Sequence, residues 1–342
     1  MNPVRDKKLE IFADSSASRI SNGMKVLMIS GDANVLREGT AAHARYLLQA
    51  AQVEQLSVLS RNPGESKVAA AMRMIREGKK GQWDVVTGQD PFWLGYIARR
   101  IAAATGARLQ IQVHTDMAAQ SLWKRIFSGY QLRAANTVRV VSERIRKELE
   151  PMRLRARLTV LPIFIDREAI RAAAPAELKK QFPQFEKIVL VASRLEPEKD
   201  VAQAIKNFRN IVRAAPKAGL IIAGDGSQLE ELRHLVAKLS LVQSVVFIGN
   251  RPDIFSYYKS VDLLLNPSRY EGFGASVVEA LAAGRAVVST DVGVAREAGA
   301  IVCDKKELGT KAAEALQSGA RGELRLALPP ALEWAQLWKE SL

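Results

Sequence analysis

The sequence has few of the residues that bind metals or form covalent cross-links. It contains one cysteine, Cys303, which excludes an internal disulfide and a zinc site built from cysteines. Its three histidines, His43, His114 and His234, are far apart in the chain, so we expect no histidine cluster for a metal. The lone cysteine indicates a reducing compartment, and we expect a cytoplasmic protein.

Long apolar runs are also missing. No stretch of 18 or more apolar residues occurs, and residues 1–23 are polar and charged. We therefore expect neither a transmembrane helix nor a secretory signal, and we expect residues 1–23 to be flexible. What is present is a chain of 342 residues, 48% apolar and 25% charged, which suggests about two globular domains.

Positive charge is abundant and unevenly distributed. The net charge is +14, and residues 1–165 carry 26 Lys/Arg against 14 Asp/Glu, whereas the rest of the chain is nearly balanced. A basic first half indicates an anionic partner, which is a nucleic acid, an acidic membrane surface or a phosphorylated substrate. Composition alone does not choose among these three.

Short apolar runs alternate with stretches of helical spacing throughout the chain. The runs are 25–29, 84–86, 109–113, 137–141 and 159–161, and then 187–191, 219–223, 244–248, 261–265 and 285–289. Buried strands that alternate with helices favour parallel sheets covered on both faces. Two such series predict an α/β chain of two tandem Rossmann-like domains, divided near Pro162 at 165/166.

Charged and glycine residues follow the expected strands of the second half, where parallel sheets bind ligands. Arg194 and Lys199 come after the strand at 187–191. An arginine fork and a lysine point charge suit a diphosphate, although two solvated surface cations are an equal alternative when this loop is taken alone. Gly224-Asp-Gly-Ser227 follows the next strand and is a weak signal, because many strand-to-helix turns use glycine.

The most informative segment is 266–280. Gly272 and Gly274 leave space for a ligand beside the backbone, and a helix expected from Ala275 directs its free N–H groups at an anion. Glu279 lies in an apolar stretch, where a carboxylate normally needs hydrogen-bond donors such as sugar hydroxyls. A solvent-facing Glu279 fits those apolar neighbours less well.

In this order, the residues resemble the retaining glycosyltransferases of family 4, which have the GT-B architecture. The resemblance covers about residues 187–297 and rests on Glu271-x7-Glu279 with Gly272-Phe-Gly274 between, on Arg194 and Lys199, on Ala223-Gly-Asp-Gly226, and on Val261–Ser268. It implies two Rossmann-like domains whose parallel sheets face a central cleft. Residues 1–165 would form the acceptor side and 166–325 the donor side, and 326–342 would form a helix that crosses back.

The resemblance also implies roles for the matching residues. Arg194 and Lys199 would bind the donor diphosphate and neutralise the departing nucleotide, and Glu279 would hydrogen-bond the ribose. Glu271 would hold the transferred sugar together with backbone N–H groups around Gly272, Phe273, Gly274 and Ala275. The co-substrate would be a UDP- or GDP-sugar, with no metal or other cofactor, and the anomeric configuration would be retained.

Two residues of the first half complete the expected site. Leu36–Ala42 resembles the family's glycine-rich loop with only Gly39 of its two glycines, so a role for Gly39 with donor phosphate or acceptor is the weaker expectation. His114 follows the strand at 109–113 and resembles the family's active-site histidine, which would contact the transferred sugar. A lone histidine is otherwise more often structural, and we interpret His43 and His234 in that way.

Residues 121–157 carry ten basic and three acidic side chains. Leu122, Trp123, Ile126, Phe127 and Tyr130 fall at helical spacing beside basic residues. Such a helix either lies in the headgroup region of an anionic membrane or packs its apolar stripe on the first sheet and exposes its charges. The first alternative places the protein peripherally on the inner face of the membrane.

We therefore expect a metal-independent retaining enzyme that acts on a saccharide or lipid-linked acceptor in cell-surface polysaccharide synthesis. A binding subunit that resembles such enzymes but catalyses weakly is the main alternative. A dinucleotide-dependent oxidoreductase lacks its Gly-x-Gly-x-x-Gly after the first strand. A nucleic-acid-binding protein is disfavoured, because no helix-turn-helix, zinc-finger or RRM signature accompanies the charge.

Overall fold

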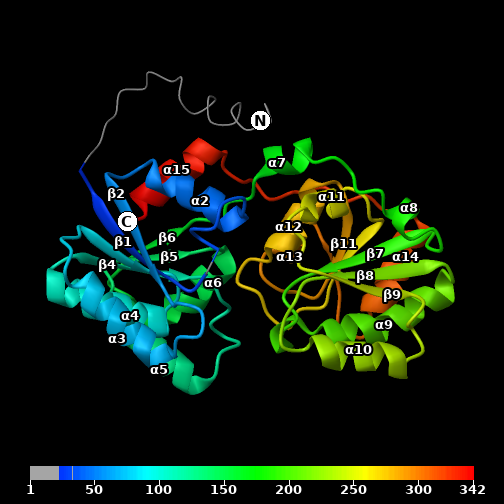
Figure 1. Cartoon of the computed structure of the whole chain (residues 1–342), viewed down its shortest axis with the longest axis horizontal. Helices are drawn as coiled ribbons and strands as arrows, with labels where there is room; N and C mark the ends of the chain where they lie inside the picture. Colours follow the sequence, from blue (N-terminus) through cyan, green and yellow to red (C-terminus); the bar gives the residue numbers. More distant parts are fainter. Residues whose placement is uncertain (1–22, 33) are drawn as a thin grey trace.

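The structure, a computed structural model, describes residues 23–32 and 34–342. Most of the segment expected to be flexible, residues 1–22, lies outside the described residues. Figure 1 shows two α/β halves side by side, each built on one sheet. Both sheets have six strands and all strand pairs in them are parallel, which confirms the prediction of two Rossmann-like domains.

The two sheets differ in the order of their strands. The first runs β2 (Gln55–Ser60), β1 (Lys25–Ser30), β3 (Val85–Gly88), β4 (Arg108–Val113), β5 (Thr137–Val140), β6 (Arg157–Val160). The second runs β12 (Ile301–Val302), β11 (Ala286–Ser289), β10 (Leu263–Asn266), β7 (Lys187–Ala192), β8 (Ala218–Ala223), β9 (Val245–Gly249). The order reverses between β1 and β3 and between β7 and β10, and such switch points are where open parallel sheets bind ligands.

Helices cover both faces of each sheet (Figure 1). In the first half they are α2 (Ala41–Ala50), α3 (Lys67–Gly78), α4 (Trp93–Thr105), α5 (Leu122–Ala134), α6 (Glu143–Leu149) and the 3-10 turn η1 (Glu150–Met152). In the second half they are α7 (Arg167–Ala172), α8 (Leu178–Gln181), η2 (Pro197–Lys199), α9 (Val201–Ala214), α10 (Leu229–Lys238), α11 (Ile254–Tyr258), α12 (Ala275–Ala282), α13 (Ala295–Ala298) and α14 (Leu308–Gln317).

The last helix, α15 (Ala331–Glu340), packs beside α2 on the first half (Figure 1). Trp334 and Trp338 are buried there in a cluster with Val26, Met28 and Leu161. The Trp334 indole also donates a hydrogen bond to the Pro162 carbonyl at 2.8 Å. The end of the chain therefore belongs to the core of the half in which the chain begins.

Two strands of the structure were not expected from the sequence. β2 alternates apolar and polar residues at the edge of its sheet, and β12 has only two residues. Neither has the continuous apolar run that marks a strand buried on both faces. The serines within β2 and the shortness of β12 explain both omissions.

Candidate active site

A cavity of about 500 Å³ lies at the carboxyl end of the second sheet. Residues that follow β7, β8 and β9 line it together with residues of α11 and α12. Its polar lining includes Arg194, Asp225, Arg251, Tyr258, Ser276 and Glu279, and Asn34 comes from the first half. Of the residues expected from the sequence, Arg194 and Glu279 therefore line one common space.

Glu279 projects from α12, and burial dominates its chemistry. The Tyr258 hydroxyl donates a hydrogen bond to Oε2 of Glu279 at 3.1 Å. Loss of solvation raises the pKa of Glu279 to about 7, against the opposing effects of that hydrogen bond and of the Arg45 charge. A carboxyl with few donors and a raised pKa is well suited to accept further hydrogen bonds from neutral hydroxyl groups.

Lys199 and Glu271 form an ion pair close to this cavity but outside its lining. Lys199 Nζ lies 2.6 Å from Glu271 Oε1, and the side chains are only 14% and 12% exposed. The Ser268 hydroxyl donates to the same oxygen at 2.9 Å. The strand order produces this contact, because η2 follows β7 and Glu271 follows the neighbouring β10.

Arg194 is held more loosely than Lys199. Its guanidinium pairs with Glu198 four residues later at 2.8 Å, and its side chain is 69% exposed. An exposed pair of this kind contributes little to stability, about 0–1 kcal/mol. The guanidinium is therefore free to exchange its partner for a ligand anion in the cavity.

The loop that leads into α12 directs backbone donors toward the same region. Gly274 has φ +88°, a left-handed conformation that favours glycine, and α12 begins at Ala275. Phe273 is buried, and its carbonyl accepts a hydrogen bond from the Val294 N–H at 3.0 Å. Within the described part of the chain, the N–H groups of Ala275 and Ser276 donate no hydrogen bond, so they are available to an anion.

The two halves touch where this loop meets the end of β4. A Cβ placed on Gly272 would lie 2.0 Å from the His114 carbonyl oxygen, so only glycine permits the approach. The Ser142 hydroxyl donates to the Gly272 carbonyl at 3.1 Å. Arg144 of α6 adds an ion pair to Asp291 at 2.6 Å. The structure thus brings His114 and the Glu271 loop together.

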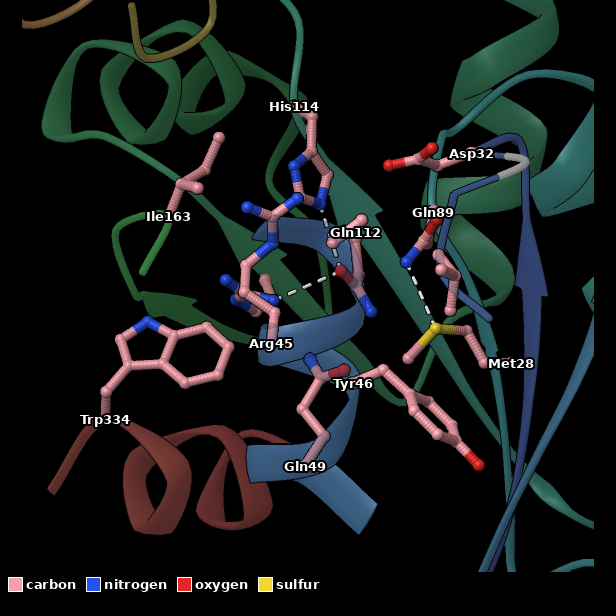
Figure 2. A pocket seen from close by; sticks show the side chains of 13 residues that line it. Met28, Asp32, Arg45, Tyr46, Gln49, Gln89, Gln112, His114, Ile163 and Trp334 are labelled. Atoms are coloured by element: carbon pink, nitrogen blue, oxygen red, sulfur yellow. Dashed lines mark hydrogen bonds between the residues drawn. The ribbon is translucent and has the colours of Figure 1, made fainter. Parts of the chain in front are cut away.

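His114 also lines a second, smaller cavity of about 70 Å³ in the first half. Figure 2 shows its ring beside Gln112, with Arg45 pointing toward it from α2. His114 Nε2 lies 3.0 Å from Gln112 Oε1. Burial and the charges of Arg139 and Arg45 lower the His114 pKa to about 3, so the imidazole is neutral near pH 7.

The hydrogen bonds around Gln112 define which nitrogen of His114 carries the proton. Gln112 Nε2 donates to the Thr87 hydroxyl at 2.9 Å, and Gln112 Oε1 accepts from Arg139 Nη1 at 3.2 Å. Oε1 is therefore an acceptor toward His114 as well, which makes Nε2 the protonated nitrogen. Nδ1 is left with a lone pair that can accept a hydrogen bond from a hydroxyl.

Gly39 lines neither cavity. It is exposed with φ +78°, directly before Thr40, whose hydroxyl caps α2 by accepting from the His43 N–H at 3.1 Å. Its conformation therefore serves the start of a helix. From the same loop, Asp32 lines the smaller cavity and Asn34 lines the larger one.

Sequence analysis missed several polar residues of these cavities. Arg139 lies in the middle of β5 and is 2% exposed, and Arg45 lies on α2. The sequence could have indicated Arg139, because an arginine within an apolar strand needs polar partners. The same argument applies to Glu279 in its apolar stretch. Arg45, Arg251 and Tyr258 had none, because only the folding of the chain brings them to the cavities.

The helix α5 contradicts one of the two alternatives for residues 121–157. Leu122, Trp123, Ile126, Phe127 and Tyr130 are between 42% and 80% exposed. The buried positions of α5 are Ser128, Gly129, Gln131 and Leu132. The alternative in which the apolar stripe packs on the first sheet is therefore wrong, because these four positions occupy the inner face and the stripe residues do not.

In residues 23–32 and 34–342, no group of three or more His, Cys, Asp or Glu side chains is arranged to hold a metal ion. No helix in that part of the chain has the length and apolar character needed to cross a bilayer.

Two sequence families match consecutive parts of the chain. Residues 25–169 match Glycosyltransferase Family 4, and residues 176–314 match Glycosyl transferases group 1. These two segments correspond to the two sheets and together span most of the chain. The chain belongs to the family 4 glycosyltransferases, which have the GT-B architecture.

Curated relatives match parts of the chain. Alpha-monoglucosyldiacylglycerol synthase of Streptococcus pneumoniae is 26% identical over 64% of this chain and 54% of its own length. Lipopolysaccharide core biosynthesis mannosyltransferase LpsB of Rhizobium meliloti is 34% identical over 32% of this chain and 33% of its own length. The matched regions thus span about half or less of these relatives.

Solved structures share the whole fold. Anabaena Alr3699/HepE in complex with UDP-glucose superposes with a TM-score of 0.70 over 93% of this chain and 95% of that chain, at 18% identity. Sucrose-phosphate synthase of Thermosynechococcus elongatus gives a TM-score of 0.71 over 93% of this chain and 94% of that chain, at 15% identity. At such identities the likeness concerns the fold alone.

Proposed function

We propose that this chain is a metal-independent, retaining glycosyltransferase that moves a sugar from a UDP- or GDP-sugar to a saccharide or lipid-linked acceptor in cell-surface polysaccharide synthesis. The observation that carries the proposal is the cavity at the β7–β10 switch point, where the Arg194 guanidinium and the Glu279 carboxyl line one space. The relatives named for glycolipid and lipopolysaccharide synthesis support this acceptor class. The UDP-glucose complex of Alr3699/HepE makes UDP the first donor base to test.

Three charged residues in or beside the donor cavity have roles in this proposal. Glu279 accepts hydrogen bonds from the ribose hydroxyls, and Arg194 leaves Glu198 to bind the diphosphate. Lys199 lies between Glu271 and the departing phosphate, and its charge stabilises the developing negative charge on the nucleotide. The free N–H groups at the start of α12 donate hydrogen bonds to the same phosphate.

Front-face attack best explains how the anomeric configuration would be retained. Lys199 at 2.6 Å and Ser268 at 2.9 Å both donate to Oε1 of Glu271, which lowers the nucleophilicity of that oxygen. In front-face attack the acceptor oxygen bonds to the anomeric carbon as the bond to the phosphate breaks, and the acceptor proton passes to the leaving phosphate. His114 then contacts the transferred sugar through its Nδ1 lone pair.

Calorimetric titration tests the donor assignment. Full-length protein is titrated with UDP, GDP and NADH, each with and without EDTA. The proposal predicts binding of UDP or GDP that resists EDTA, followed by transfer or slow hydrolysis of the matching nucleotide sugar. Binding of NADH alone, or loss of binding in EDTA, contradicts it. Tight UDP binding without turnover on any UDP-sugar favours the weakly catalytic binding subunit.

We further propose that α5 attaches the enzyme to an anionic membrane surface on the cytoplasmic side. Every residue from Ser121 to Ile126 is exposed, including Trp123 at 80% and the cations Lys124 and Arg125. Apolar side chains insert between lipid headgroups, and neighbouring cations are attracted to anionic lipids. A lipid-linked acceptor would then be delivered to the half that carries His114.

Vesicle sedimentation tests this attachment. The double variant Trp123→Ser/Ile126→Ser should lower binding to vesicles with 30% phosphatidylglycerol by at least tenfold, because it removes two inserted side chains. Val242→Ser, an equally apolar and 60% exposed position in the second half, serves as the control and should bind as the wild type does. Equal vesicle binding by the double variant and the wild type would remove α5 from the proposal.

A further inference from the structure

Two arginines converge on the small cavity of the first half. Arg139 enters from β5 and Arg45 from α2, and both line the space beside His114. Figure 2 shows Arg45 extended from its helix toward the His114 ring, above Trp334. Neither the donor roles nor the membrane attachment described above uses these guanidinium groups.

Arg139 has only neutral partners. It donates to Gln112 Oε1 at 3.2 Å and to the carbonyls of Leu161 and Pro162 at 3.3 and 3.4 Å, and its guanidinium lies 5.5 Å from the Trp334 ring centre. Its Nε is buried without a hydrogen-bond partner among the described residues. A buried cation without a neighbouring carboxylate is costly unless a ligand supplies the negative charge.

Arg45 adds a second positive charge at the same cavity. It makes no hydrogen bond or ion pair with the described residues. Burial lowers the pKa of Arg45, and the charges of Asp32 and Glu279 oppose that shift. The only carboxylate in the cavity lining is Asp32, which accepts a hydrogen bond from the Asn34 N–H at 2.9 Å. With His114 neutral, two cations against one carboxylate leave an excess of positive charge.

We infer that this cavity binds an anionic group, a carboxylate or a phosphate, of the acceptor. The cavity is small, about 70 Å³ against about 500 Å³ for the donor cavity, which suits one charged group of a larger molecule. Guanidinium groups bind carboxylate and phosphate oxygens through paired N–H donors. The inference rests on the proposed transferase function and names the class of its acceptor.

Three glucose-based sugars that differ only in the group at carbon 6 provide the test. Glucuronate, glucose 6-phosphate and glucose are titrated by calorimetry into full-length protein saturated with UDP. At least one anionic sugar should bind tenfold or more tightly than glucose, which corresponds to about 1.4 kcal/mol. The better of the two identifies the carboxylate or the phosphate as the recognised group. Equal affinities for all three sugars overturn the inference, as does anion binding that UDP abolishes, because the anion would then occupy the donor site.

Variants of Arg45 connect that preference to the cavity. Arg45→Gln should remove most of the preference for the anionic sugar, and Arg45→Lys should retain part of it. Arg37→Gln, an exposed arginine of the preceding loop, is the matched control and should keep the full preference. Titration of each protein with UDP and GDP separates the two proposals. If the wild type binds neither nucleotide, the transferase is refuted. If Arg45→Gln binds the nucleotide and keeps the full anion preference, only the anionic acceptor is refuted.

Discussion

The two halves of the molecule share one fold but treat charge in opposite ways. In the second half, the charges near the donor cavity are paired with one another, as in Lys199 with Glu271 at 2.6 Å and Asp200 with both Arg269 and Lys305. In the first half, Arg139 is surrounded by amide, carbonyl and aromatic groups.

The two sites differ in whether their own side chains balance the charges that they hold. A balanced ion pair keeps the donor site stable without nucleotide, and the nucleotide must then compete for groups that are already satisfied. An excess of cations at the small first-half cavity lowers its stability and favours the binding of an anion there. The same sheet topology thus supports a site that is satisfied before binding and a site that binding completes.

The most direct way to break the balance in the donor half is Lys199→Ala. It leaves the Glu271 carboxylate buried with Ser268 alone and removes a positive charge from the leaving phosphate. Turnover of the nucleotide sugar should fall by roughly 10²–10³-fold. Removal of one partner of a buried pair also costs about 3–5 kcal/mol of unfolding free energy, so circular dichroism must first show that the variant is folded.

Lys217→Ala is the matched control for this loss. Lys217 pairs with Glu186 at 2.6 Å, but both side chains are more than 60% exposed. Its removal should leave both stability and turnover close to those of the wild type, because the pair is exposed to solvent. Wild-type turnover in folded Lys199→Ala would remove Lys199 from the catalytic site.

A smaller effect is expected where the two halves meet. In Gly272→Ala the new Cβ would lie 2.0 Å from the His114 carbonyl oxygen, so the loop and the end of β4 must separate. Misplacement of reacting groups by about 1 Å costs up to ~10²-fold, and we expect kcat/KM to fall 10- to 100-fold while UDP affinity changes less than threefold.

Gly23→Ala provides the comparison for that substitution. Its Cβ meets only the carboxylate end of the Glu54 side chain at 2.9 Å, which can move aside. Kinetics of this variant should match the wild type. Unchanged kcat/KM in Gly272→Ala would mean that the close approach of the halves is not needed for transfer.

The sequence predicts the donor half better than the acceptor half for a physical reason. Most donor-side candidates lie in loops that directly follow buried strands, and strand order alone then brings Lys199 to Glu271. The acceptor cavity is assembled from a strand interior, a helix face and the last helix, through Arg139, Arg45 and Trp334. No spacing in the sequence indicates that these three meet.

Exposure was the other property that sequence patterns could not determine. The apolar spacing of α5 predicts an amphipathic helix, but both a sheet and a membrane can cover such a face. In the structure, the small residues Ser128 and Gly129 lie on the inner face of α5, so the apolar stripe faces outward. The described fold shows where the apolar stripe lies, and only vesicle binding shows what covers it.

The smallest expected effect is on the pH dependence of stability and concerns Glu279. Glu279 is the exception in the donor half, because no cation is paired with its carboxyl. Its pKa is about 7 in the folded chain against 4.5 for the free side chain, so the folded state holds the proton more tightly. Stability from this group is complete below pH 4.5 and is lost as the pH rises to about 7, by on the order of 3 kcal/mol in total. Glu279→Gln keeps an acceptor for Tyr258 and should abolish that slope in urea unfolding at pH 5, 6, 7 and 8. Glu186→Gln is the control. The Lys217 ammonium already lowers the pKa of Glu186, so this variant should keep the slope of the wild type. A slope shared by all three proteins would assign the pH dependence to another group.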